Sequence, residues 1–272
     1  MEPILVVEDL HFRYPDGTAA LRGVTFAIQR GRRVALMGPN GAGKSTLLLH
    51  LNGIYLPQKG RVQVGGCELS AATEEQVRTQ VGLVFQDPDD QVFSPTVWDD
   101  VCFGPLNLGL SLAEVEARAE EALSAVGLLP LRSRSPQRLS LGQKKRVAIA
   151  GVLAMRPAVM ALDEPMAFLD PEGQRQVEEV LDRLHRQGVT LLVATHDVDW
   201  AANWADEVIL LVEGKVIAQG SPALLTDPDL VRQARLRMPL VAQLFGELAD
   251  VRPVPYRLEQ AAVILHRLCS GR

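Results

Sequence analysis

The chain has 272 residues, of which 47% are hydrophobic and 22% are charged, and its 28 Lys and Arg against 33 Asp and Glu give a formal net charge of −5. The apolar share excludes a disordered chain, and the length allows one large domain or two small ones. The acidic balance disfavours nucleic acid as a partner, and the absence of an apolar run of about 18 residues disfavours a membrane span, so we expect a soluble, cytosolic protein.

The first predicted elements are β-strands. Segments 4–14, 23–28 and 62–64 are rich in strand-forming residues and are separated by turn residues. We expect them to form a mixed or antiparallel sheet in the N-terminal part of the chain.

Short, wholly apolar runs then alternate with helical patterns, which predicts a parallel sheet covered by helices on both faces. The expected strands are 34–37, 81–85, 158–162 and 190–194, followed by a hairpin over 207–219. The expected helices are 44–52, 96–104, 111–126 and 170–187. Thr96, Ser111 and Asp170 are the expected N-caps of the last three.

Two changes of pattern divide the chain. The stretch at about 87–156 is mostly helical, and we interpret it as a helical subdomain inserted into the series of strands. After residue 222 the pattern changes to short helices interrupted by prolines. We therefore expect a main domain over 1–222 and a C-terminal helical appendage over 223–272, whose helically spaced apolar residues favour packing between subunits.

A phosphate-binding loop is expected between the strand at 34–37 and the helix that follows it. Residues 38–46 match the pattern G-x-x-x-x-G-K-[ST]. Glycines let several backbone N–H groups converge on one anion, and the helix N-terminus adds its positive dipole. The candidate nucleotide-binding residues of the loop are Asn40, Gly41, Gly43, Lys44, Ser45 and Thr46. The Lys44 ammonium would reach the β- and γ-phosphates, and the Ser45 hydroxyl would bind Mg²⁺.

Two acids follow the apolar strand at 158–162. Parallel sheets bind ligands at the carboxyl ends of their strands, so Asp163 would lie beside the phosphate loop and help to hold Mg²⁺. Glu164 stands one residue further on and could polarise an attacking water. Alone, this pair would be read as an acidic strand-to-helix turn, but the phosphate loop favours the functional interpretation.

A segment just before the acidic strand resembles the LSGGQ signature of ATP-binding cassette (ABC) ATPases. It comprises Leu139 and the run Ser140-Leu141-Gly142-Gln143. Six motifs occur in the order of that family: the phosphate loop, Gln86, the signature, Asp163-Glu164, Leu169-Asp170 and His196. The resemblance covers residues 1 to about 222 and implies a P-loop NTPase fold of class α/β with a RecA-like core, an N-terminal antiparallel β subdomain and an inserted helical subdomain.

The resemblance also implies ATP and Mg²⁺ as cofactors and assigns roles to single residues. Tyr14 resembles the aromatic residue that stacks on adenine. Gln86 would offer its amide oxygen to Mg²⁺ or to the attacking water, and His196 would bind the γ-phosphate and that water. Asp170 looks like the aspartate that contacts the partner subunit.

The signature predicts a second anion site at a helix start, because Ser140 and Gln143 form a Ser-x-x-Gln capping pattern. In the family, this site closes on the ATP of the opposite subunit, so that two chains clamp two ATPs head to tail. The resemblance implies that Ser140, Gly142 and Gln143 bind nucleotide in this way. Leu141 replaces the first glycine of the motif and would be penalised if its φ were positive.

Residues 87–101 and 103–110 are similar to the ATPase subunits of energy-coupling factor (ECF) importers, and the run Gly-Pro-Leu-Asn-Leu-Gly-Leu at 104–110 resembles the cobalt-transport members. The resemblance implies a head-to-tail homodimer and an integral membrane subunit that docks near residues 87–105. It also implies indirect contact with a substrate-binding membrane subunit and a peripheral location on the cytoplasmic face of the membrane.

Other functions remain open from the sequence. The imported substrate could be cobalt, nickel or a vitamin, or the chain could be a soluble ABC ATPase without a transport role. A small-molecule kinase would not need the signature, Gln86 or His196. A regulatory subunit that binds but does not hydrolyse ATP is opposed by Glu164 and His196.

Overall fold

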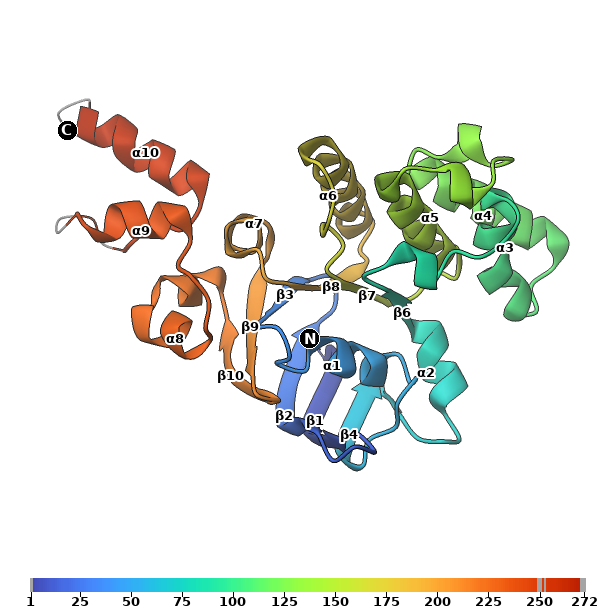
Figure 1. Ribbon diagram of the computed structural model, residues 1–272, viewed down its shortest axis with the longest axis horizontal. Helices are drawn as coiled ribbons and strands as arrows, with labels where there is room; N and C mark the ends of the chain where they lie inside the picture. Colours follow the sequence, from blue (N-terminus) through green and yellow to red (C-terminus); the bar gives the residue numbers. More distant parts are fainter. Residues whose placement is uncertain (1, 249–250, 252, 270–272) are drawn as a thin grey trace.

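The N-terminal strands form a four-stranded antiparallel sheet in the computed structural model, which describes residues 2–248, 251 and 253–269 (Figure 1). The sheet order is β2-β1-β4-β5, and its antiparallel pairing agrees with the mixed or antiparallel sheet expected from the sequence. The strands are β1 (Pro3–Arg13), β2 (Ala19–Gln29), β4 (Lys59–Val64) and β5 (Cys67–Glu68).

The second sheet has six strands in the order β10-β9-β3-β8-β7-β6. These are β3 (Arg33–Met37), β6 (Val81–Val84), β7 (Val159–Asp163), β8 (Thr190–Thr195), β9 (Glu207–Val212) and β10 (Lys215–Gly220). All pairs are parallel except the β9–β10 hairpin. The carboxyl ends of β3, β6, β7 and β8 therefore meet at one edge, where a parallel sheet binds ligands.

Two hydrophobic cores lie on the two faces of the parallel sheet. Alternating side chains of β3 divide between them: Val34 and Leu36 join one core, while Ala35 and Met37 join the other. The first core contains helix α1 (Lys44–Leu51), which lies between the two sheets (Figure 1). The sheet is thus covered on both faces, which explains its nearly continuous apolar strands.

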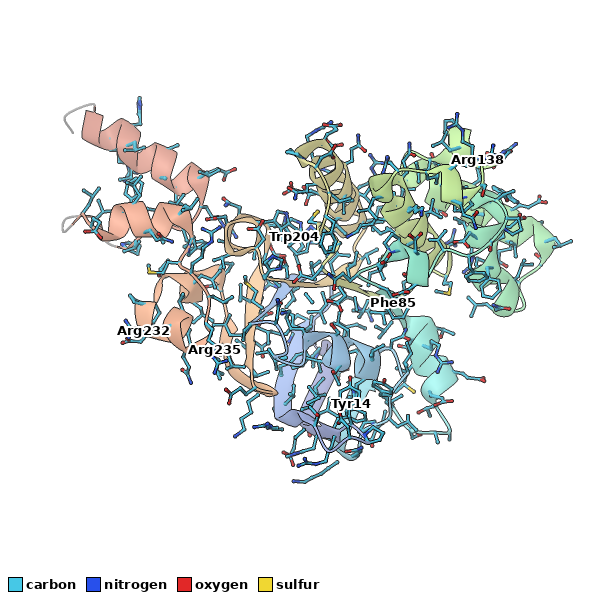
Figure 2. All side chains as sticks on the ribbon, viewed as in Figure 1. Tyr14, Phe85, Arg138, Trp204, Arg232 and Arg235 are labelled. Atoms are coloured by element: carbon cyan, nitrogen blue, oxygen red, sulfur yellow. The ribbon has the colours of Figure 1, made fainter. Side chains whose placement is uncertain are left out.

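Helices α5 (Leu141–Ala154), α6 (Pro171–Arg186) and α7 (Val198–Trp204) cover the opposite face from α1. Helix α2 (Glu74–Gln80) precedes β6 and contributes Val77 to the core around α1. Buried Trp204 stacks on Trp200 with ring centroids 4.5 Å apart, and the Arg33 guanidinium lies 5.7 Å from the Trp204 ring centroid. Figure 2 labels Trp204, the last residue of α7.

Helices α3 (Val97–Asn107) and α4 (Leu112–Ala125) pack with α5 to form the helical region between β6 and β7. Its 3₁₀ turns are η1 (Pro88–Asp90), η2 (Leu129–Leu131) and η3 (Pro136–Arg138). The Thr96 hydroxyl caps α3, as expected, but the predicted end at Gly104 is wrong, because the helix continues through Pro105 to Asn107. Gly104 is needed for close packing, since a Cβ there would lie 2.7 Å from Met155 Cγ.

After β10 the chain forms η4 (Pro222–Thr226), α8 (Pro228–Gln233), α9 (Leu240–Gly246) and α10 (Leu258–Cys269). Leu225 and Ala234 join the main core, whereas Phe245, Val251 and Ala261 form a small cluster of their own. Figure 1 shows α9 and α10 at the end of the molecule opposite the helical region. Among the described residues, no helix combines the length and apolarity needed to cross a membrane.

Candidate active site

The phosphate loop joins β3 to α1 and curls around a buried ammonium group. Lys44 Nζ donates hydrogen bonds to the carbonyl oxygens of Gly38 at 2.8 Å and Pro39 at 3.2 Å. Burial lowers the pKa of Lys44, and the nearby carboxylates of Glu164 and Asp163 oppose this effect. Gly43 caps α1 with φ +104, and Asn40 and Gly41 are exposed on the loop. The α1 N-terminus and one cation thus share one small anion-binding region.

Asp163 ends β7 directly beside this loop. Burial raises the pKa of Asp163, and the neighbouring Ser45 hydroxyl and Lys44 charge oppose the increase. A hydroxyl and a carboxylate that lie together next to a phosphate loop suit Mg²⁺, which prefers oxygen ligands.

Glu164 and His196 face each other across the ends of β7 and β8. His196 Nδ1 lies 2.9 Å from Glu164 Oε1, and the exposed fractions of the two side chains are 67% and 12%. The Glu164 backbone has φ +44, and its N–H donates to the Ala194 carbonyl at 2.9 Å. This anchor turns the Glu164 side chain toward the sheet edge, where a carboxylate can accept a proton and the imidazole can orient it.

Tyr14 lies close to the start of α1. Its hydroxyl is 2.9 Å from Thr46 Oγ1, and its ring packs edge-on against Phe12 with centroids 5.0 Å apart. Tyr55 stacks on Phe12 at 5.0 Å, which completes an aromatic cluster that the sequence reasoning missed. Figure 2 labels Tyr14 in the lower part of the molecule, beside the N-terminal sheet. The cluster fixes one aromatic ring next to the phosphate loop.

Gln86 is exposed on the loop that follows β6, at the same sheet edge as Asp163. A second glutamine, which the sequence reasoning did not select, fixes this loop: the Gln91 side chain accepts from Phe85 N at 3.0 Å and donates to the Leu83 carbonyl at 3.2 Å. Asp87 accepts from Asp89 N at 2.9 Å and caps the next turn. Gln91 belongs to no known sequence motif, so its role in fixing this loop can be seen only from its contacts in the folded chain.

The signature residues form the capping box that their spacing predicts. Ser140 Oγ accepts from Gln143 N at 3.3 Å, and Ser140 N donates to Gln143 Oε1 at 3.1 Å. Leu141 is the first residue of α5 and is absent from the described residues with positive φ, so the penalty considered for its Cβ does not arise.

The start of α5 lies beside the start of α6. A Cβ added to Gly142 would be 3.7 Å from Leu169 Cδ2 and 3.8 Å from Gly173 Cα, and Asp170 caps α6 by accepting from Gly173 N at 2.7 Å. A cavity of about 480 Å³ is lined by both helix starts and by Phe168, but by no residue of the phosphate loop. The starts of α5 and α6 therefore lie apart from the phosphate loop of the same chain.

Comparison with known proteins identifies a family whose members bind ATP. The ABC transporter family model matches residues 21–167. The ECF transporter ATP-binding protein EcfA of Carboxydothermus hydrogenoformans is 50% identical over 261 residues, which cover 96% of this chain and 97% of EcfA. EcfA of Methanocaldococcus jannaschii is 51% identical over 255 residues, which cover 93% of this chain and 91% of that protein.

Solved structures agree as well. CbiO1 of Clostridium perfringens, described as part of the ABC transporter complex CbiONQ, superimposes with a TM-score of 0.77 at 41% identity over 90% of this chain and all of that chain. A dimeric ATP-binding cassette in a post-hydrolysis state with ADP and phosphate gives a TM-score of 0.71 at 29% identity, over 80% of this chain and 98% of its own.

Proposed function

We propose that this chain, which belongs to the ABC transporter ATPases and is an ATP-binding subunit of the ECF type, hydrolyses ATP to power the import of cobalt ion. The observation that carries the hydrolytic part is the meeting of Lys44, Asp163 and the Glu164–His196 pair at one sheet edge. Cobalt is supported by the similarity of residues 104–110 to cobalt-transport members of the family.

The phosphate loop binds the β- and γ-phosphates of ATP through its N–H groups and the Lys44 ammonium. Ser45, Asp163 and Gln86 would hold Mg²⁺, which when bound neutralises charge on the phosphate oxygens. Thr46 and Tyr14, whose side chains contact each other, lie on the same side of the loop, and the Tyr14 ring stacks on adenine. Asn40, Gly41 and Gly43 shape the loop around the phosphates.

Hydrolysis proceeds by attack of water on the γ-phosphorus. Glu164 accepts a proton from the water as the new P–O bond forms, and the bond to the β-phosphate oxygen breaks with its electron pair leaving on ADP. His196 orients the Glu164 carboxylate and donates to the γ-phosphate, and Gln86 positions the water.

A second copy of the chain completes each nucleotide site. Ser140, Gly142 and Gln143 form a helix start that lies apart from the phosphate loop of the same chain, which supports binding to ATP held by the other chain. Asp170 stands at the neighbouring helix start and contacts that partner. This arrangement is a head-to-tail homodimer with two ATPs.

The docking site for the integral membrane subunit is a cavity of about 680 Å³ between α2, α3 and α5. Phe93 and Phe103 meet edge to face at its mouth with centroids 5.0 Å apart, and they are 66% and 47% exposed. The proposed docking segment 87–105 lines part of this cavity. The segment directly follows Gln86, so a helix seated in the cavity senses nucleotide state. The substrate-binding membrane subunit is linked through that subunit, at the cytoplasmic face of the membrane.

Asp100 lies in the docking segment 87–105, but it fixes the preceding loop rather than offering its charge to a partner. Its side chain accepts from Phe93 N at 3.0 Å and from Ser94 N at 2.9 Å, and the residue is only 8% exposed. Charge reversal there would release the loop that carries Phe93. A test of docking therefore belongs on the exposed aromatic residues.

Phe103→Asp is expected to lower transport by the assembled complex at least about 10-fold while the ATPase rate of the isolated chain changes less than about 2-fold. The new charge would be desolvated under a docked apolar helix, which destabilises that contact. Leu112→Asp is the matched control, since Leu112 is 72% exposed in the same helical region but does not line the cavity. Equal transport by the two variants would reject the docking site.

The import function is tested by co-purifying the chain with its membrane partners and measuring uptake of cobalt chloride into vesicles that contain ATP on the side of the ATPase. We expect ATP-dependent cobalt uptake that is abolished by Lys44→Ala. If the vesicles take up nickel or a vitamin but not cobalt, that compound replaces cobalt as the proposed substrate. If the chain hydrolyses ATP but no membrane partner co-purifies with it and no uptake occurs, a non-transport ABC ATPase is favoured.

A further inference from the structure

Lys145 is a buried cation on the signature helix that the hydrolytic scheme above does not use. The residue is 2% exposed, although lysine is rarely buried without a partner. Its Nζ donates to the Glu164 carbonyl at 3.1 Å and to the Ala167 carbonyl at 2.9 Å. One side chain of α5 therefore holds both ends of the first turn after the acidic strand.

That turn has a strained backbone at both ends. Glu164 has φ +44 and Phe168 has φ +64, values that residues with a Cβ seldom adopt. Phe168 is 84% exposed, so its side chain contributes little burial to offset this conformation. Within the turn, Ala167 N donates to the Glu164 carbonyl at 3.1 Å. The Lys145 ammonium supplies the remaining hydrogen bonds to the two carbonyls.

We propose that Lys145 is a positioning residue that clamps the turn from Glu164 to Ala167 onto the signature helix and thereby holds the Glu164 carboxylate in its hydrolytic orientation. The inference rests on the proposed role of Glu164 as the proton acceptor. Lys145 does not touch the reacting atoms and acts through the backbone of Glu164.

The clamp also links the start of the signature helix to the Glu164 carboxylate of the same chain. Ser140 and Gln143, which start α5, lie within two turns of Lys145 on the same helix. A movement of α5 when the signature closes on the partner's ATP is transmitted by the Lys145 ammonium to the backbone of Glu164. The Glu164 carboxylate, 2.9 Å from His196, then moves with it.

The charge that this clamp needs is present at neutral pH. Burial lowers the pKa of Lys145 to about 8, and the charges of Glu164 and Asp87 limit the decrease. The ammonium therefore still predominates at pH 7, and it can donate to both carbonyls at once.

Lys145→Met in the full chain, with turnover measured against ATP concentration, tests the proposal. Methionine keeps the length and fills the space but cannot donate, so kcat should fall about 10- to 100-fold while KM for ATP changes less than about 3-fold. Lys145→Gln, whose amide can donate two hydrogen bonds, should recover part of kcat. Lys59→Met is the control: it removes a lysine contact of 2.9 Å to Asp9 far from this turn and should leave kcat unchanged.

Each result decides the proposal. A wild-type kcat in Lys145→Met overturns it. An equal loss of kcat in the Lys145→Met and Lys145→Gln variants, together with a lower melting temperature and a higher KM, also overturns it, because that result assigns Lys145 a purely structural role. Glu164→Gln is measured beside them: if that variant keeps wild-type turnover, the proposed function of Glu164 fails, whatever the Lys145 variants show.

Discussion

Replacing Glu164 with Gln is expected to lower ATP turnover by about 10²- to 10⁴-fold while ATP binding persists, the scale that loss of a general base produces. The amide has the shape of the carboxylate and keeps a contact with His196, but it cannot accept a proton from water. The phosphate contacts come from Lys44 and the loop backbone, which the substitution leaves in place. Phosphate release and ATP affinity should be measured on the same preparation.

Glu121→Gln is the matched control for this change. Glu121 is exposed and pairs with Arg156 at 2.7 Å on the outside of the helical region, so turnover should stay within about 2-fold of wild type. His196→Ala should lower turnover as well, because Glu164 loses the group that orients it. Full turnover in Glu164→Gln would contradict the assignment of Glu164 as the proton acceptor.

The parts of the site that the sequence could predict are those whose geometry is local or follows from parallel pairing. The Ser140–Gln143 capping box is encoded by residues three positions apart, and the hydrogen bonds form as the spacing indicates. The proximity of Asp163 to Ser45 follows because β3 and β7 both pair in parallel with β8, so their carboxyl ends share one edge.

Long-range contacts could not be predicted in this way. Lys144, Lys145 and Arg146 look alike in the sequence, yet Lys144 pairs with Asp89 at 2.6 Å while Lys145 is buried and Arg146 donates to the Val126 carbonyl at 3.1 Å. Helical phase puts Lys145 on the face of buried Ile149 and Val152, but only the neighbouring turn explains why a charge belongs there.

The end of α3 illustrates the same limit. Gly104 followed by Pro105 is typical of a helix end, because glycine and proline weaken helices. In the folded chain, Gly104 permits close contact with Met155, and α3 therefore continues to Asn107. Tertiary packing thus overrides the local preference at this position.

Gly38→Ala is expected to destabilise the folded chain by about 3–5 kcal/mol, which places it among the largest single-residue effects. A Cβ at this position would lie 2.0 Å from the Leu211 carbonyl oxygen and 3.1 Å from its carbon. These are backbone atoms of β9, which is held between β3 and β10, so they cannot move aside without breaking sheet hydrogen bonds. Urea unfolding monitored by circular dichroism measures the effect.

Gly66→Ala separates this clash from the general cost of replacing glycine. Gly66 has φ +84 and open space around its Cβ position, so alanine there should cost only about 1–2 kcal/mol from the left-handed conformation. If the two variants unfold at the same urea concentration, the clash at Gly38 is not decisive. If Gly38→Ala unfolds at a lower urea concentration than Gly66→Ala, we expect its ATP binding to be weakened as well. The packing of β3 against β9 then requires glycine as the first residue of the phosphate loop, before any phosphate is bound.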